Sequence, residues 1–259
     1  MAQFDSRYAQ AATAARAGVA VDEGLRAYMV SVYNYMAAGV ALTGVVAYML
    51  FSAAVTGDPA SAVARLGNGI MLTEFGRLLF VSPLRWVIML APLAFVFFLS
   101  FRVYQMSVSA AQIAFWLFAA AMGASLSTIF LVFTGASITR VFFITAAAFA
   151  SLSLWGYTTR KDLSGWGTFL FMGLIGIIIA ALVNLFLQSS ALQFAVSVMG
   201  VLVFAGLTAY DTQRIKDGYY AVVGSAEMAA KSAIMGALSL YLDFINMFTS
   251  LLYLFGERE

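Results

Sequence analysis

The sequence contains no cysteine and no histidine. Without cysteine, disulfide bonds, thiol catalysis and thiolate metal sites are excluded. Without histidine, the chain lacks the usual general base at neutral pH and the commonest ligand of transition metals. The ionisable groups that remain belong to Asp, Glu, Lys, Arg and Tyr. This set suits protons and hard cations such as calcium.

Charged residues are scarce as well. They make up 10% of the 259 residues, whereas hydrophobic residues make up 63% and the mean hydropathy is +0.93. A soluble domain carries about 25% charged residues, so most of this chain's exterior must face lipid. The formal net charge is only +2 and no basic tract is present, which excludes a nucleic-acid partner.

Seven stretches are long and apolar enough to cross a hydrocarbon core, which takes about 20 helical residues. They are Tyr28–Val55, Leu84–Phe101, Val108–Phe133, Ile138–Thr158, Ser164–Leu187, Ser190–Tyr210 and Ala233–Phe255. The sequence therefore predicts an all-α polytopic membrane protein, with a polar N-terminal tail (residues 1–27) and a seven-helix transmembrane domain (residues 28–256).

The distribution of basic residues predicts the orientation of these spans. If the N-terminus is cytoplasmic, the inner side carries Arg7, Arg16, Arg26, Arg102, Arg160, Lys161, Arg214, Lys216 and Lys231. The outer side then carries Arg65, Arg77, Arg85, Arg140 and Arg258. Because cytoplasmic loops are enriched in Lys and Arg, we expect a cytoplasmic N-terminus and an external C-terminus.

The longest connection, Thr56–Pro83, is not simply polar. Apolar residues recur in it at nearly helical spacing, at Val63, Leu66, Ile70, Phe75 and Leu79. This pattern is compatible with a short helix lying in the membrane interface, and equally with an irregular loop.

Asp243 is the most informative residue of the chain. It lies near the middle of the last predicted span, and no other charged residue lies within ten positions of it. A carboxylate at mid-bilayer costs about 2.5–3.5 kcal/mol on insertion scales, so we expect it to face a polar interior, find a partner or stay protonated. Small and polar residues share its helical face at 3-4-3-4 spacing: Gly236, Ser239, Asn246 and Ser250. The face predicts either an ion pathway or a packing seam in which a protonated Asp243 joins helices.

Asp211 and Arg102 are less distinctive. Asp211 follows the sixth span within AYDTQRI, and Arg102 closes the second span at the same predicted depth. An ion pair between them is geometrically feasible. Taken alone, each residue is also typical of a solvated span end.

Three segments together resemble the Bax inhibitor family of membrane proteins. They are ALSLYLDFINMFTSLLYLFG (Ala237–Gly256), TTRKDLSGWGTFLF (Thr158–Phe171) and AYDTQRI (Ala209–Ile215). The similarity extends over the membrane region from about Leu25 to Gly256, and the last-helix motif is long and specific. The resemblance implies a fold in which the last helix is surrounded by the other six.

The resemblance also implies a function. Bacterial members of the family are similar to pH-sensitive calcium leak channels, in which aspartates on helices six and seven sense pH and an arginine ending helix two latches onto the first. By motif, the pair is Asp211 and Asp243, and Arg102 matches the latch. The connection Asp217–Lys231 looks longer than in compact members, which bears on how closely the aspartates approach.

These residues suggest a mechanism. Two carboxylates in one poorly hydrated site cannot both ionise cheaply, so they titrate as a coupled pair. A shared proton would hold helices six and seven together, and its loss would introduce repulsion that Arg102 or an entering calcium ion offsets. Calcium is then the transported ion, with Asp211 and Asp243 as its candidate ligands and Ser239, Asn246 and Ser250 as supporting polar groups. No other cofactor is expected.

Several alternatives stay open. The chain resembles, in part, non-conducting regulators that bind a membrane-bound AAA protease, with the N-terminal tail as the natural contact. A proton-coupled cation exchanger is a third interpretation. We do not expect an enzyme, because without His or Cys the remaining pairs are Ser–Lys or Asp–Asp and no Lys lies in a predicted span. We predict a multi-pass protein of a bacterial inner membrane, although a mitochondrial or reticular membrane fits the same composition.

Overall fold

The computed structural model describes the backbone of residues 2–67 and 69–258, and the side chains of residues 23–67 and 69–258. Seven of its helices are long and apolar enough to cross a membrane. They are α1 (Ala2–Ala54), α3 (Leu84–Arg102), α4 (Val108–Leu126), α5 (Gly135–Thr158), α6 (Ser164–Leu187), α7 (Ser190–Val222) and α8 (Ala226–Phe255). Short 3-10 turns, η1 (Val103–Gln105) and η2 (Ser127–Leu131), extend α3 and α4. The predicted all-α polytopic membrane fold is confirmed.

The helices begin where the sequence supplies hydroxyl caps. A serine or threonine precedes α4, α5, α7 and α8, and its side-chain oxygen accepts a hydrogen bond from a backbone N–H in the first turn. This contact satisfies one of the donors that a helix start leaves unpaired. The four caps are Ser107, Thr134, Ser189 and Ser225.

Two helices are longer than hydropathy predicts. The expected connection Asp217–Lys231 is wrong, because α7 continues to Val222 and α8 already begins at Ala226. Polar residues beyond the apolar stretch remain helical because they pack on neighbours: Tyr219 and Lys231 are buried. The added turns shorten the connection to residues 223–225 and hold α7 and α8 in close antiparallel register.

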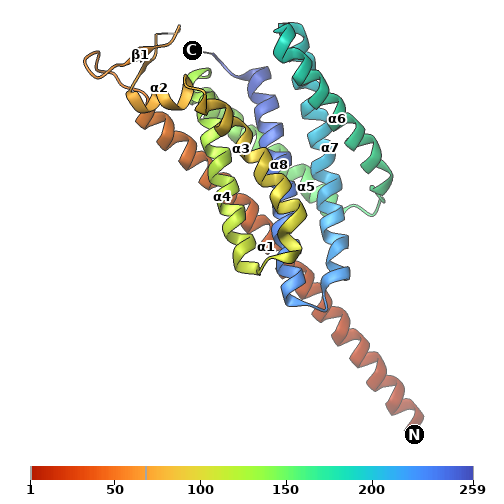
Figure 1. The fold of residues 1–259 in the computed structure, drawn as a ribbon. Coiled ribbons are helices and arrows are strands. Elements are labelled where there is room, and N and C mark those ends of the chain that lie inside the picture. The colour runs from red at the N-terminus through yellow and green to blue at the C-terminus, as the bar shows by residue number, and fades with distance from the viewer. Residues whose placement is uncertain (1, 68, 259) are drawn as a thin grey trace.

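The N-terminal tail is continuous with the first span. Residues 2–54 form one helix, α1, and its N-terminal part projects from the bundle (Figure 1). The side chains of residues 1–22, including Arg7 and Arg16, lie outside the described residues.

The long connection after α1 is helical only at its end. Val63, Leu66 and Ile70 belong to an antiparallel hairpin of two short strands, β1 (Ala64–Arg65) and β2 (Met71–Leu72), and not to a helix. Only α2 (Glu74–Phe80) is helical, with Phe75 and Leu79 on it. Gly69, which has a positive φ of 89°, allows the turn that interrupts the helical spacing.

The bundle has two distinct ends. At the one we call the hairpin end lie β1, β2, α2 and the C-terminus, and the N-terminal extension of α1 leaves the opposite end (Figure 1). We call this opposite end the basic end, because α3, α5 and α7 finish there near Arg102, Arg160 and Lys216. Which end faces the cytoplasm stays a prediction.

The last helix lies at the centre of the bundle. α8 packs against α1, α4, α5 and α7, while α3 packs mainly on α4 and α6 mainly on α7. Its described neighbours bury more than half of its span, whereas α6 has one buried residue, Leu170. Lipid therefore covers α6 extensively and α8 very little.

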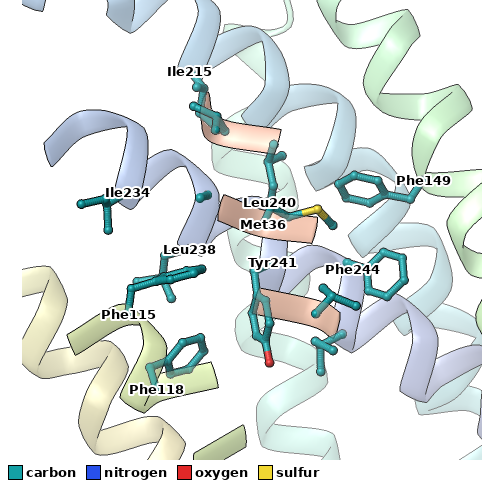
Figure 2. Packing of buried hydrophobic residues seen from close by; sticks show 14 of the residues in the cluster. Met36, Phe115, Phe118, Phe149, Ile215, Ile234, Leu238, Leu240, Tyr241 and Phe244 are labelled. Carbon is teal, nitrogen blue, oxygen red and sulfur yellow. The ribbon is translucent and has the colours of Figure 1, made fainter. Parts of the chain in front are cut away.

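Aromatic and aliphatic side chains fill the space around α8 (Figure 2). Tyr241 packs edge-to-face against Phe115 and Phe118 of α4, and Phe244 packs in the same way against Phe149 of α5. The Tyr241 hydroxyl lies 2.6 Å from the Thr43 hydroxyl of α1, which donates to the Ala119 carbonyl oxygen at 2.8 Å. A buried polar contact thus ties three helices together within the apolar core.

Glycines set the closest helix approaches. A Cβ added at Gly156 of α5 would collide with the Ala209 carbonyl of α7, and one at Gly200 of α7 would collide with the Ser250 hydroxyl of α8. Small residues at such crossings let backbones approach in lipid, where the hydrophobic effect does not drive association.

The Gly156 crossing gives a first prediction. Gly156→Ala should lower the free energy of unfolding by about 1–3 kcal/mol, because the methyl group overpacks the α5–α7 contact. Gly176→Ala in α6 is the matched control, since a Cβ there meets nothing within 4 Å. Thermal unfolding in detergent measures both, and equal stability of the two variants would contradict the proposed close crossing.

Candidate functional site

Asp243 lies inside the central helix, as the sequence predicts, and is 4% exposed. Among the buried side-chain nitrogen and oxygen atoms that the structure describes, its Oδ2 alone lacks a hydrogen-bond partner. An unpaired buried carboxyl oxygen is costly. Asp243 is therefore the strongest candidate for a group retained for function.

Asp211 lies on the neighbouring helix α7 and is 7% exposed. Because α7 continues eleven residues beyond it, to Val222, Asp211 is an internal residue of a packed helix and not a solvated span end. Thr208 and Thr212, on the same part of α7, are completely buried. Asp211 and Asp243 line the same cavity, so the structure brings the sequence-predicted pair to one site.

Both aspartates line one cavity of about 530 Å³ between α6, α7 and α8, which we call the aspartate cavity. Ser239 and Asn246 of α8 line it as well, so the predicted polar face of α8 points into it. From α6, Ser164 and Thr168 contribute hydroxyl groups. The cavity thus gathers carboxylate, hydroxyl and amide oxygens, the ligand type that calcium prefers.

The other two residues of the polar face of α8 contact α7. Gly236 packs on Ile215, and Ser250 packs on Gly200. Ser250 also lines a second cavity further along α8. The amide nitrogen of Asn246 donates to the Leu242 carbonyl at 2.8 Å, and the Ser250 hydroxyl donates to the Asn246 carbonyl at 2.7 Å.

Arg214 is the site residue that sequence reasoning missed. Its Nη2 lies 3.2 Å from Asp211 Oδ1 and 3.5 Å from the Ser239 hydroxyl, and its guanidinium lies over the Tyr210 ring. The side chain is 55% exposed, and of the α7 residues that line the cavity it lies nearest the basic end. The sequence feature that could have identified Arg214 is its position one turn after Asp211, which places both residues on one helical face.

Arg102, the predicted latch, lies at the end of α3, which finishes at the same end of the bundle as α7. It is exposed at the end of α3, and Arg214 supplies the cation in the only ion pair of Asp211 among the described residues. The latch role of Arg102 stays a prediction.

A lysine does lie within the last helix. Lys231 was expected to precede the span, but it is buried in α8, where its Nζ lies 2.7 Å from Glu227 Oε1 and donates to the Tyr104 carbonyl at 3.3 Å. The helix extension at the basic end is what encloses it. A hydropathy profile does not detect such an extension, because the extended turns contain polar residues that are stabilised by pairing with one another.

Two of the sequence motifs meet at the basic end. The Gln213 side chain accepts from the Leu163 backbone N–H at 2.8 Å and donates to the Lys161 carbonyl at 2.9 Å. Lys216 donates to the Tyr157 carbonyl at 2.9 Å. The segment Ala209–Ile215 of α7 is therefore hydrogen-bonded to the turn between α5 and α6. This contact holds the part of α7 that carries Asp211 in place.

Comparisons with known proteins identify the family of the chain. A family model described as "Inhibitor of apoptosis-promoting Bax1" matches residues 25–259. The chain belongs to the Bax inhibitor family.

Bacterial relatives are similar over most of the chain. An uncharacterized protein of Caulobacter vibrioides is 43% identical over all 259 residues and its whole length. "Inner membrane protein YbhL" of Escherichia coli is 44% identical, covering 91% of this chain and 94% of the relative. "Uncharacterized protein RP147" of Rickettsia prowazekii is 46% identical over 92% of each chain. With its seven apolar spans, this Bax inhibitor family member is a multi-pass protein of a bacterial inner membrane.

The acidic groups of this family member are few. Within the described residues no cluster of three or more Asp or Glu is present. Calcium usually takes six to eight oxygen ligands, so two carboxylates with neutral oxygens would form a weak site. Such a site is suited to brief occupancy and not to storage.

The ion pair of Asp211 gives a second prediction. In a double-mutant cycle, Arg214→Gln and Asp211→Asn should couple by about 0.5–1 kcal/mol, because Arg214 is half-exposed and the pair spans a single helix turn. The cycle of Arg102→Gln with Asp211→Asn is the control and should show no coupling. Unfolding in mixed micelles measures both. Coupling confined to Arg102 would support the predicted latch and exclude Arg214 as the partner of Asp211.

Proposed function

We propose that the chain is a pH-sensitive calcium leak channel in which Asp211 and Asp243 bind either a shared proton or a passing cation. The observation that carries the proposal is the buried Asp243 Oδ2, which has no hydrogen-bond partner and lines a polar cavity with Asp211. A carboxyl group of this kind is unfavourable for packing alone, because an apolar residue would fill the position at lower cost.

The proposed gate acts between α7 and α8. Two adjacent carboxylates in a poorly hydrated site cannot both carry charge cheaply, so the closed state holds one proton between them. Loss of this proton creates repulsion across the α7–α8 contact. Arg214 lies beside Asp211 and offsets part of the repulsion, and a calcium ion offsets the rest while it passes.

The third prediction concerns calcium flux into proteoliposomes between pH 6 and 8. Flux of the unchanged protein should increase several-fold toward pH 8, because deprotonation of the pair opens the contact. Asp243→Asn and Asp211→Asn should each give a low flux that no longer varies with pH.

Asp162→Asn is the matched control for these variants. Asp162 lies in the exposed α5–α6 turn, where hydrogen bonds from Ser164 hold its pKa below the ordinary value. It is therefore ionised throughout this pH range, and its loss should leave the pH profile unchanged. Folded protein that passes no calcium at any pH would refute the channel proposal.

One observation favours a second candidate function, regulation of a membrane-bound AAA protease. α1 begins at Ala2, although its span begins at Glu23, and the extra turns project from the basic end (Figure 1). A projecting helix is accessible to a partner in the same membrane.

Deletion of residues 2–22 distinguishes the two candidates and is the fourth prediction. Under the channel proposal the deletion should leave calcium flux and its pH profile unchanged, because the aspartate cavity lies wholly within α6, α7 and α8. Co-purification of the protease with the full chain, lost on deletion while flux is absent from both, would favour the regulator.

A further inference from the structure

A second cavity adjoins the aspartate cavity. It has a volume of about 540 Å³ and is lined by residues of α3, α4, α6, α7 and α8. Four residues line both cavities: Leu174, Phe204, Leu242 and Asn246. The two spaces therefore meet at a shared boundary formed by three apolar side chains and one amide.

The two cavities are arranged in series across the membrane. Along α8, Ser239 and Asp243 line the aspartate cavity toward the basic end, and Ser250 and Tyr253 line the second cavity toward the hairpin end. On the antiparallel helix α7 the order is reversed, with Gln193 in the second cavity and Asp211 in the first. Together they extend along α8 from Ser239 to Tyr253, about half of the length of this helix.

Oxygen atoms line the second cavity on both of these helices. The hydroxyl groups of Ser197, Thr249 and Ser250 each donate to the carbonyl oxygen one turn earlier, at 2.9, 3.0 and 2.7 Å. Because each hydroxyl proton is used within its own helix, the lone pairs of Thr249 and Ser250 remain available to the cavity, while the Ser197 oxygen also accepts from the Gln193 amide at 3.3 Å. Gln193 is held in place by bonds to Asn184 and Ser197.

Polar groups at this depth require an explanation. Lipid chains filling the cavity would offer no hydrogen bond to the spare lone pairs of these oxygens. Water or a partly hydrated cation would engage them, which favours a hydrated cavity. By contrast, the boundary residues Phe204, Leu174 and Leu242 offer no polar side-chain atom, and apolar constrictions of this kind block ions by excluding water.

We propose that the second cavity is the hairpin-end vestibule of the same cation route, and that Phe204, Leu174 and Leu242 form an apolar constriction between the vestibule and the aspartate cavity. This inference rests on the proposed channel function. It adds a second barrier to the one formed by the carboxylate pair. The aspartates set the charge of the cation route, and the constriction sets whether water can fill it.

Cysteine accessibility tests the vestibule without measuring flux. Since the chain has no cysteine, each introduced cysteine is the only thiol. Thr249→Cys and Ser250→Cys should react with a membrane-impermeant, positively charged methanethiosulfonate added at the hairpin end, and Ser239→Cys with reagent added at the basic end. Thr145→Cys, at a completely buried α5 position outside both cavities, should react from neither side.

Right-side-out and inside-out vesicles supply the two sides. Labelling of Thr249→Cys and Ser250→Cys only by a lipid-soluble maleimide would show that lipid fills the cavity and would overturn the vestibule. Their equal labelling from both ends in the closed state at pH 6 would overturn the constriction.

Calcium flux then tests the constriction, as the fifth prediction. Phe204→Ala should raise flux at pH 6 several-fold, because the shortened side chain lets water through while the aspartates are unchanged. Phe194→Ala makes the same chemical change at an α7 residue that is 64% exposed and outside both cavities, and should have no effect. Leu174→Ala is a second test if the Phe204→Ala variant unfolds at too low a temperature to be assayed.

The outcomes separate the two proposals. An unchanged protein that leaks calcium while folded Phe204→Ala and Leu174→Ala variants leak no more than Phe194→Ala would overturn the constriction alone. An unchanged protein without flux would overturn the channel, and the accessibility of Thr249→Cys and Ser250→Cys would still decide whether the vestibule is aqueous.

Discussion

The burial of one carboxyl group, that of Asp243, constrains the whole arrangement of helices. Its cost at mid-membrane is a few kcal/mol even on insertion scales, about 2.5–3.5 kcal/mol, so the helix that carries it cannot face lipid. α8 accordingly lies at the centre, and α1, α4, α5 and α7 surround it. The polar face of α8 then needs a polar neighbour, which α7 provides through Asp211, and the remaining faces take the aromatic packing around Tyr241 and Phe244.

The same constraint explains why burial and hydropathy run in opposite directions among the seven spans. The most apolar span, α6, is the least buried, and the least apolar span, α8, is the most buried. Since lipid is the solvent for the outer surface, apolar residues are best placed outside, and the interior collects the residues that lipid excludes. Glycines such as Gly156 and Gly200 then let the polar helices approach one another closely.

Sequence alone was sufficient for the number of spans and for most of their ends. The length of an apolar stretch reflects the thickness of the bilayer that it crosses, so the bounds of Ser164–Leu187 were predicted without error. It cannot report helix that continues beyond the apolar stretch by pairing polar groups, and for this reason the turns containing Tyr219 and Lys231 were taken for a connection. The hairpin was missed because its apolar residues imitate helical spacing until Gly69 turns the chain.

The site was predicted in part. Asp243 was recognisable because an isolated charged residue inside an apolar helix cannot face lipid cheaply. The polar residues that share its face of α8 follow from helical periodicity. The pairing of Asp211 came from the family resemblance, since nothing local separates a packed aspartate from a solvated span end. Arg214 was overlooked because a basic residue near the membrane surface usually marks orientation. Its role depends on the extension of α7, which only the three-dimensional structure reveals.

Under the proposed function, pH sensing and conduction are one property of the aspartate pair. A third carboxylate would bind calcium more tightly and slow its release, and none is clustered with the pair in the described part of the chain. A single aspartate would neither share a proton nor create repulsion when the proton leaves. Two carboxylates therefore satisfy both requirements: the proton and the cation compete for the same oxygens, so the conditions that empty the site of protons are those that let calcium enter. Conduction also requires binding weak enough to release the ion, and the neutral oxygens beyond Asn246 meet that requirement on the way to the hairpin end.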